Sequence, residues 1–471
     1  MLKILADAGC RSVRALRTRR QSWLAGFANC DALRNLRCLA AALFVGASFV
    51  LRAAQPSAGA ETAKWVDDNL PQLTELYVKL HQAPELSLQE VRTSELLAAE
   101  LTALGAQVTR GLGGHGVVGT VENGPGKTVM VRADMDALPV VEATPVPYAS
   151  KVKVKDGSGA EVGVMHACGH DIHMTCLVGT ARYLIAHKDQ WSGRLQILFQ
   201  PAEERGAGAK AMLDDGLFKK LAKPDFALAL HVDATLATGS VGCRAGYTLA
   251  NVDSVDITVK GRGGHGAYPH TTVDPIVQAA QLILELQTIV SREISPTDPA
   301  VITVGAIRGG TKHNVIGDKC ELQVTVRSFT DEVRSHLLAA IRRKALAVAA
   351  GARAPEPTIV VSEGTPAMYN DPALTGRLTP VLKKALGNEQ VVDSEPSMGG
   401  EDFSEYGRAG VPIFMFRLGA VDGRRLARYR EMKIEPPSLH SALFYPDPEG
   451  TISTGVIAMT ASVLDLMAPD K

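Results

Sequence analysis

The strongest constraint on the fold comes from nine residues, Met165 to His173, which read Met-His-Ala-Cys-Gly-His-Asp-Ile-His. They contain five side chains that can bind a metal ion: His166, Cys168, His170, Asp171 and His173. Thiolate, imidazole and carboxylate groups are the ligands of zinc and related ions. Cys168 and His170 are two residues apart and can face one centre, and Gly169 permits a tight turn between them. A buried or reactive cysteine beside scattered histidines is the alternative.

Ligand-type residues recur after predicted strands. Residues 194–199 form a predicted strand that leads to Glu203 and Glu204, and residues 226–230 form another that ends in His231. Adjacent glutamates after a strand point to different sides, so one can bind a metal while the other faces the substrate as a general base. Ligand sites in open α/β sheets gather at strand ends. An exposed charge pair and a core histidine are the alternatives, but the recurrence favours a metal site.

A third predicted strand, residues 128–132, is followed closely by Asp134 and Asp136. Carboxylates at the end of a buried strand are destabilising unless they are paired, hydrogen-bonded or near a cation. We interpret Asp136 as a carboxylate that orients a metal ligand. The alternative is a loop aspartate that caps the next turn.

The segment from Val252 to Ser362 has a pattern of its own. It predicts the order β-α-β-β-α-β, with strands at 252–260, 300–307, 320–329 and 358–362 and helices at 275–294 and 331–350. This order is that of a ferredoxin-like domain of about 110 residues. Because α/β character resumes after it, the small domain is expected to be inserted into a discontinuous larger one. A glycine-rich stretch before its first helix lets His265 project.

The first 60 residues differ from the rest. Arginines are frequent between positions 11 and 37, and the apolar run 38–51 that follows is too short for a comfortable membrane span. Ala58-Gly59-Ala60 has the pattern of a signal-peptide cleavage site. We expect export to the periplasm or the medium, or a cytoplasmic location if the leader is not a functional signal. An uncleaved anchor or a wrongly assigned start is the alternative.

Charge excludes some partners. The 50 lysines and arginines balance the 50 aspartates and glutamates. A formal net charge of zero argues against electrostatic binding of nucleic acid or of an acidic membrane. We therefore expect a small-molecule substrate, no nucleic-acid partner and no stable membrane span.

Eight motifs occur in an order that resembles the aminoacylase/carboxypeptidase-type dinuclear metallohydrolases: RADMDALP, MHACGHDIH, QPAEE, ALHV, GRGGHGAYPH, GGTKHNVIG, MGGEDFS and SLHS. The chain is most similar to the hippurate hydrolase and indole-acetyl-amino-acid amidohydrolase group. The resemblance implies an α/β fold, a phosphorylase/hydrolase-like zinc-peptidase catalytic domain with an inserted ferredoxin-like α+β lid (dimerisation) domain. The expected divisions are a leader at 1–60, a catalytic domain at 61–248 and 365–471, and a lid at 249–364.

Carried over by position, the resemblance implies two divalent metal ions per chain. Cys168 would bridge them, and the remaining ligands would be His170, Glu204, His231 and His440. Zinc or manganese is expected, with cobalt or nickel as alternatives, and the thiolate favours the softer ions.

The resemblance also implies roles in catalysis. Glu203 would be the general base, and His265 would reach the active site of the partner subunit in a homodimer built through the lid domain. Asn314 and Arg327 would bind the carboxylate of the substrate.

The implied activity is hydrolysis of the amide bond of N-acyl amino acids, such as hippurate-like conjugates, to a carboxylic acid and an amino acid. The alternatives are a metallo-dipeptidase or carboxypeptidase, a deacetylase of N-acetylated biosynthetic intermediates, and a non-catalytic ligand-binding protein of the same fold. Glu203 and every implied ligand are present, which favours an enzyme. Gly317 replaces a proline frequent in the group, and the segment 151–161 resembles an insertion, so substrate preference stays open.

Overall fold

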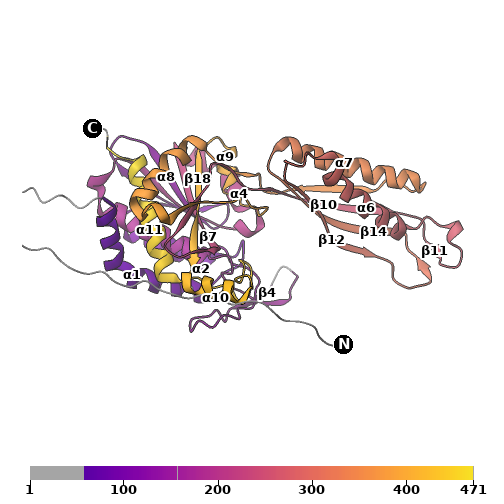
Figure 1. The fold of residues 1–471 in the computed structure, drawn as a ribbon, viewed down its shortest axis with the longest axis horizontal. Coiled ribbons are helices and arrows are strands. Elements are labelled where there is room, and N and C mark those ends of the chain that lie inside the picture. The colour runs from indigo at the N-terminus through magenta and orange to yellow at the C-terminus, as the bar shows by residue number, and fades with distance from the viewer. Residues whose placement is uncertain (1–57, 156–157, 470–471) are drawn as a thin grey trace, which may run out of the picture. The chain divides into compact units, whose positions relative to one another are not determined.

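The computed structural model describes residues 58–155 and 158–469 (Figure 1). The predicted leader lies outside the described residues except for positions 58–60, which begin helix α1 (Ala58–Gln82). Within the described ranges, no helix combines the length and the apolar character that a membrane span needs.

A mixed sheet of eight strands organises the catalytic domain. The strand order is β1-β2-β6-β3-β7-β18-β8-β17. The bounds are β1 Gln107–Leu112, β2 Gly116–Asn123, β3 Thr128–Asp134, β6 Gly193–Gln200, β7 Phe226–Ala237, β8 Val241–Cys243, β17 Val391–Asp393 and β18 Ile413–Val421. The central strands β6, β3, β7 and β18 are parallel. Their carboxyl ends therefore meet at one edge of the sheet, where ligand sites of such sheets form.

Helices cover both faces of this sheet, which is why its central strands are almost continuously apolar. One face carries a large apolar core together with α1, α2 (Val91–Ala103), α3 (His170–Ala186), α8 (Pro372–Leu386) and α11 (Pro448–Leu466). A smaller core on the other face includes α4 (Gly208–Asp214), α5 (Leu217–Lys220) and α9 (Ser404–Arg408). Figure 1 shows α8 and α11 on one side of β18 and α4 and α9 on the other.

The lid domain has a sheet of its own with the strand order β12-β14-β10-β15, in which all neighbours are antiparallel. Its elements are β10 Asn251–Lys260, α6 Pro275–Glu293, β12 Ala300–Gly309, β14 Lys319–Ser328, α7 Asp331–Gly351 and β15 Thr358–Glu363. One face of the sheet packs against α6 and α7. This is the ferredoxin-like arrangement, so the predicted fold class is confirmed.

Several elements differ from the sequence-based expectation, and two of them, β7 and β18, bear on the site. The sequence predicts a strand that ends at His231, whereas β7 continues to Ala237 because β18 pairs with it over most of its length. Strand β18 itself is absent from the prediction. Its run Ile-Phe-Met-Phe-Arg-Leu-Gly-Ala-Val is buried on both faces, and such a short apolar run has no periodicity that separates a strand from a buried helix.

A buried ionic cluster connects α1 to the start of α3. His81 is 1% exposed, and its Nδ1 lies 2.7 Å from Oδ2 of Asp171. Its Nε2 lies 3.1 Å from Oε1 of Glu142. Burial lowers the pKa of His81, but the hydrogen bonds to the two carboxylates outweigh burial and raise the pKa to about 9. The ring is therefore an imidazolium that donates from both nitrogens.

Substituting His81→Ala should lower the free energy of unfolding by about 3–5 kcal/mol, because two buried carboxylates lose their counter-charge. Urea denaturation followed by circular dichroism measures this loss. His336→Ala is the control: the His336 side chain is 44% exposed and its Nε2 lies 3.3 Å from Glu293, so the loss should stay below about 1 kcal/mol. Equal losses in the two variants would show that the buried cluster does not stabilise the fold.

Candidate metal centre

The segment MHACGHDIH forms a turn that leads directly into α3, so that His170 is the first residue of the helix. The φ angle of Gly169 is +79°, and a Cβ at this position would lie 2.6 Å from Cγ2 of Val232. Only glycine fits such a backbone without strain. The turn places Cys168 and His170 on the same side of the chain, and both side chains are buried.

Three more ligand-type side chains surround this turn. Nε2 of His231 lies 3.6 Å from Sγ of Cys168. The two carboxylate oxygens of Glu204 lie 3.8 Å from Nε2 of His170 and 3.4 Å from Nε2 of His440. Cys168, His170 and His231 thus form one group whose ligand atoms lie within 4.8 Å of one another, and Cys168, Glu204 and His440 form a second. The fold brings the five predicted ligands together around a shared thiol; that they bind metal stays a prediction.

The chemistry of these groups fits a metal. Nε2 of His170 and Oε1 of Glu204 are buried and have no hydrogen-bond partner among the described residues. Unpaired buried polar atoms are destabilising, and a bound cation would satisfy both. Burial raises the pKa of the Cys168 thiol, and a bound cation would favour the thiolate instead. Thiolate together with imidazole is typical of sites for zinc and other soft ions.

Backbone hydrogen bonds orient the histidines. Nδ1 of His170 lies 2.7 Å from the carbonyl oxygen of Asp136, and Nδ1 of His231 lies 2.8 Å from that of Val232. A carbonyl only accepts, so each Nδ1 carries the proton and each Nε2 is available to a metal. The backbone amide of His440 donates to the carbonyl of Ala167 at 2.9 Å, which connects the SLHS motif to the metal-binding turn.

Glu203 and Glu204 do not lie on opposite sides of an extended chain, so the argument used to divide their roles is wrong. They begin a one-turn 3-10 helix, η2 (Glu203–Arg205). Oε2 of Glu203 and Oε1 of Glu204 lie 3.9 Å and 3.8 Å from the same atom, Nε2 of His170. The turn directs both carboxylates toward the site, with side chains only 9% and 8% exposed.

Two buried carboxylates accept hydrogen bonds from backbone amides of this turn and of the residue before it. Asp136 accepts hydrogen bonds from the amides of Glu203 and Glu204 at 3.1 Å and 3.0 Å. Glu90, at the start of α2, accepts from the amide of Ala202 at 2.8 Å. Asp136 thus supports the turn that carries both glutamates, and its role in orienting a metal ligand stays a prediction. Glu90 is a positioning residue that the sequence analysis missed, because nothing in its local pattern marks it.

A buried arginine was also missed. Arg132 in β3 forms ion pairs with Asp134 at 2.7 Å, Glu401 at 2.9 Å and Asp402 at 3.0 Å. Asp134 accepts in addition from Nδ1 of His173 at 2.6 Å. The network joins the motifs RADMDALP and MGGEDFS and, through His173, the start of α3. The strand-end carboxylate Asp134 and the acidic pair in the MGGEDFS loop were the sequence signals for this network.

The remaining metal-competent side chains of the motif lie outside the two ligand groups around Cys168. Both ring nitrogens of His173 are engaged, since Nε2 accepts from the amide of Val232 at 2.9 Å. Asp171 belongs to the His81 cluster. His166 is buried, and neither of its ring nitrogens has a partner among the described residues. Burial lowers the pKa of His166 to about 4, so it is neutral at pH 7.

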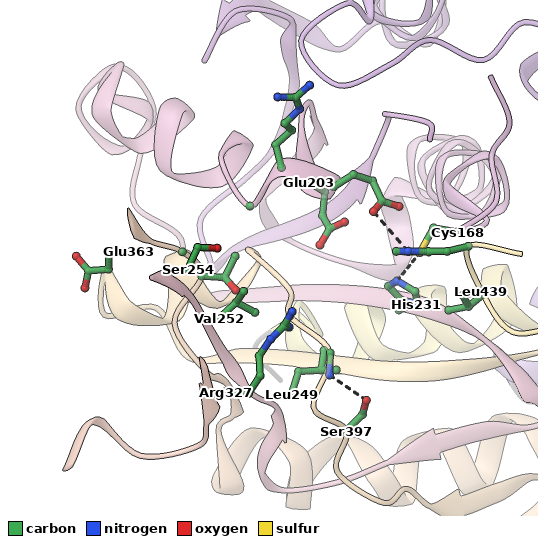
Figure 2. A pocket seen from close by; sticks show the side chains of 18 of the residues that line it. Cys168, Glu203, His231, Leu249, Val252, Ser254, Arg327, Glu363, Ser397 and Leu439 are labelled. Atoms are coloured by element: carbon green, nitrogen blue, oxygen red, sulfur yellow. Dashed lines mark hydrogen bonds and ion pairs between the residues drawn. The ribbon is translucent and has the colours of Figure 1, made fainter. Parts of the chain in front are cut away.

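A cavity of about 520 Å³ opens onto the ligand groups (Figure 2). Cys168, Glu203, Glu204, His231 and His440 line it from the catalytic domain, and Val252, Ser254 and Arg327 line it from the lid. Figure 2 shows Arg327 projecting from β14 toward the ligand groups. Its Nε donates to Oγ1 of Thr325 at 3.0 Å, and its Nη1 donates to the carbonyl of Met398 at 3.2 Å.

His265 and Asn314 are not among the described residues that line this cavity. They lie at a small pair of strands in the lid, β11 (Gly264–His265) and β13 (Val315–Ile316). His265 is exposed, and its Nδ1 accepts from the amide of Ala267 at 3.0 Å. Oδ1 of Asn314 is buried without a partner in the described part of the chain. A single chain therefore does not bring these two predicted residues to the ligand groups.

The doubly covered sheet, the inserted lid and the cluster of ligand groups define the class of the zinc-peptidase-like hydrolases. Residues 130–443 match peptidase family M20/M25/M40. The chain belongs to this family and is a hydrolase, so the predicted family is confirmed.

Relatives span several activities. The chain is 37% identical to thermostable carboxypeptidase 2 of Saccharolobus solfataricus, over 81% of this chain and 91% of the relative. It is 35% identical to IAA-amino acid hydrolase ILR1-like 2 of Arabidopsis thaliana, over 73% of this chain and 76% of the relative. The crystal structure of the Bacillus subtilis YXEP protein, described as a dinuclear metal binding peptidase, superposes with a TM-score of 0.69 at 28% identity and covers 85% and 99% of the two chains.

Proposed function

We propose that the protein hydrolyses the amide bond of N-acyl amino acids, such as hippurate-like conjugates, with the help of two divalent metal ions. The observation that carries this proposal is one cavity that four of the five ligand groups line on one side, with His170 buried behind them, and Arg327 on the other side. A guanidinium binds a carboxylate with two parallel hydrogen bonds, so Arg327 is suited to the carboxylate that an N-acyl amino acid presents next to its amide.

The two groups around the thiol suggest how the ions would be held. Cys168, His170 and His231 would bind one ion, and Cys168, Glu204 and His440 the other. We expect zinc or manganese, with cobalt or nickel as alternatives. A bound divalent ion supplies Lewis-acid activation of water and of the amide carbonyl at neutral pH.

The protein's own groups would move the proton. Glu203 would accept a proton from the attacking water and deliver it to the leaving nitrogen. Burial and the nearby carboxylates of Glu401 and Glu204 raise the pKa of Glu203 well above its usual value, which makes it a stronger base in the absence of a cation. Arg327 would hold the substrate carboxylate while the amide bond breaks. Asn314 lies outside the cavity of its own chain, so it would join Arg327 only from the lid of a second chain.

A substrate panel tests this proposal. Protein loaded with Zn²⁺, Mn²⁺, Co²⁺ or Ni²⁺ is given N-benzoylglycine, N-acetyl amino acids, indole-acetyl amino acids and dipeptides with a free amino group. Faster release of amino acids from the N-acyl compounds supports the proposal. Faster cleavage of the dipeptides would favour a dipeptidase or carboxypeptidase, the activity class named for one relative. No hydrolysis with any metal would contradict both.

We further propose a homodimer in which His265 of each chain completes the oxyanion site of the other. Inactive His265→Ala mixed with inactive Glu203→Gln should then recover activity, because in a mixed dimer the site with intact Glu203 receives an intact His265. Random exchange of equal amounts makes about half of the dimers mixed, each with one competent site of two, so about a quarter of wild-type turnover should return. Recovery at background, after subunit exchange is verified by mass, would exclude a role for His265 in the partner's site.

A further inference from the structure

Three arginines line the same cavity, Arg205, Arg327 and Arg417, and the proposed mechanism does not use Arg417. Arg417 lies in β18 directly opposite His231 of β7 in the parallel register. Residues opposite one another in a sheet project from the same face. The neighbouring pair Met415 and Ala229 lies in the core of that face, whereas Phe416 and Leu418 lie in the core of the other face. Arg417 therefore extends beside His231 into the cavity.

Within residues 58–155 and 158–469, Arg417 has no partner of opposite charge. It is half-buried in a strand whose other residues are all buried. No hydrogen bond or ion pair joins its guanidinium to another of the described residues, whereas that of Arg327 donates to Thr325 and Met398. A partly desolvated guanidinium without a counter-charge is destabilising, so this one is expected to bind an anion.

The acids of the cavity do not supply that anion. Glu203 and Glu204 both lie within 4 Å of Nε2 of His170, on the side of the proposed metal ions. Glu363 is ion-paired with Arg334 at 2.9 Å, and Figure 2 shows its carboxylate directed away from the other labelled side chains of the cavity. The partner of Arg417 must therefore enter with the substrate.

A simple N-acyl amino acid has one carboxylate, which we assign to Arg327. We propose that Arg417 binds a second carboxylate, so that the preferred substrates are N-acyl amino acids with two carboxylates. This inference rests on the proposed amide hydrolysis and specifies its substrate class. The second carboxylate can come from the acyl group, as in the half-amide of a dicarboxylic acid, or from the side chain of an acidic amino acid.

Two matched pairs of substrates separate these sources. N-succinyl-L-leucine and N-succinamoyl-L-leucine differ only in a carboxylate or carboxamide on the acyl group. N-benzoyl-L-glutamate and N-benzoyl-L-glutamine differ in the same way on the amino acid. The metal-loaded wild-type enzyme should show kcat/KM at least about 10-fold higher for the carboxylate member of one pair, because a charge-assisted hydrogen bond is lost with the amide.

Substituting Arg417→Met should lower this ratio of kcat/KM values about 10-fold, since methionine keeps much of the apolar volume and removes the charge. A ratio measured within one variant cancels differences in folded fraction and in metal content. Arg417→Lys keeps the charge and should recover part of the ratio. Arg205→Met is the matched control, because Arg205 also lines the cavity but is exposed, and its ratio should stay within about twofold of wild type.

The pair whose ratio falls identifies the half of the substrate that carries the second carboxylate. If all four compounds are hydrolysed and neither ratio falls in Arg417→Met, the inference is wrong and the proposed function stands. An equal loss for both members of each pair would mean that Arg417 and Arg327 share a single carboxylate, which also overturns the inference. No hydrolysis of any of the four by the loaded wild-type enzyme, and none of N-benzoylglycine, would overturn the proposed function and this inference together.

Discussion

Substituting Glu203→Gln is expected to lower kcat by at least about 100-fold while the metal content stays at the wild-type value. Glutamine has nearly the same shape as glutamate, so the 3-10 turn and its hydrogen bonds to Asp136 and Glu90 should persist. The substitution removes only the ability to accept the proton of the attacking water. Steady-state kinetics and elemental analysis of the same sample measure the two quantities.

The neighbouring residue provides the control. Glu204→Gln should release metal, because Oε1 and Oε2 of Glu204 approach His170 and His440, the proposed ligands on either side of the centre. The 3-10 turn directs both carboxylates toward the site. The two variants therefore decide which glutamate is the general base and which is the metal ligand. Metal loss in Glu203→Gln and metal retention in Glu204→Gln would reverse the assignment.

Substituting Cys168→Ala is expected to abolish tight binding of at least one metal ion and to reduce hydrolysis to background. The Cys168 thiol belongs to both groups of ligand atoms, so no other single side chain is shared by the two proposed ions. Elemental analysis after dialysis measures the bound metal. Cys176→Ala is the matched control, since Cys176 is buried in α3, the helix that follows the turn of Cys168, but its Sγ lies 3.9 Å from the carbonyl oxygen of Ile452. Wild-type metal content in Cys168→Ala would contradict the bridging role.

The sequence predicts the lid and the positions of the ligands because both depend on local patterns. Alternating strands and amphipathic helices are visible between residues 252 and 362, and Cys168 and His170 lie within one motif. The fold then explains why distant ligand groups meet: Glu204 follows β6 and His231 lies within β7, and the parallel strands β6, β3 and β7 share one edge at their carboxyl ends.

Features that depend on distant partners were not predicted. Arg132 pairs with Glu401, which lies 269 residues later in the sequence. No local pattern indicates that a guanidinium in a buried strand will meet that carboxylate. The extension of β7 beyond His231 depends on β18, whose apolar run is ambiguous by itself. Arg417 is significant only because that pairing places it beside His231 and inside the cavity.

The central claim is that amide hydrolysis depends on two metal ions at the cluster around Cys168. The most direct test is the initial rate of N-benzoylglycine hydrolysis as metal is added back to chelated protein, plotted against ions bound per chain. We predict no hydrolysis in the metal-free protein and a maximum at two ions per chain. An undiminished rate in protein with less than about 0.1 ion per chain would contradict the claim, because the cluster would then be dispensable for the reaction.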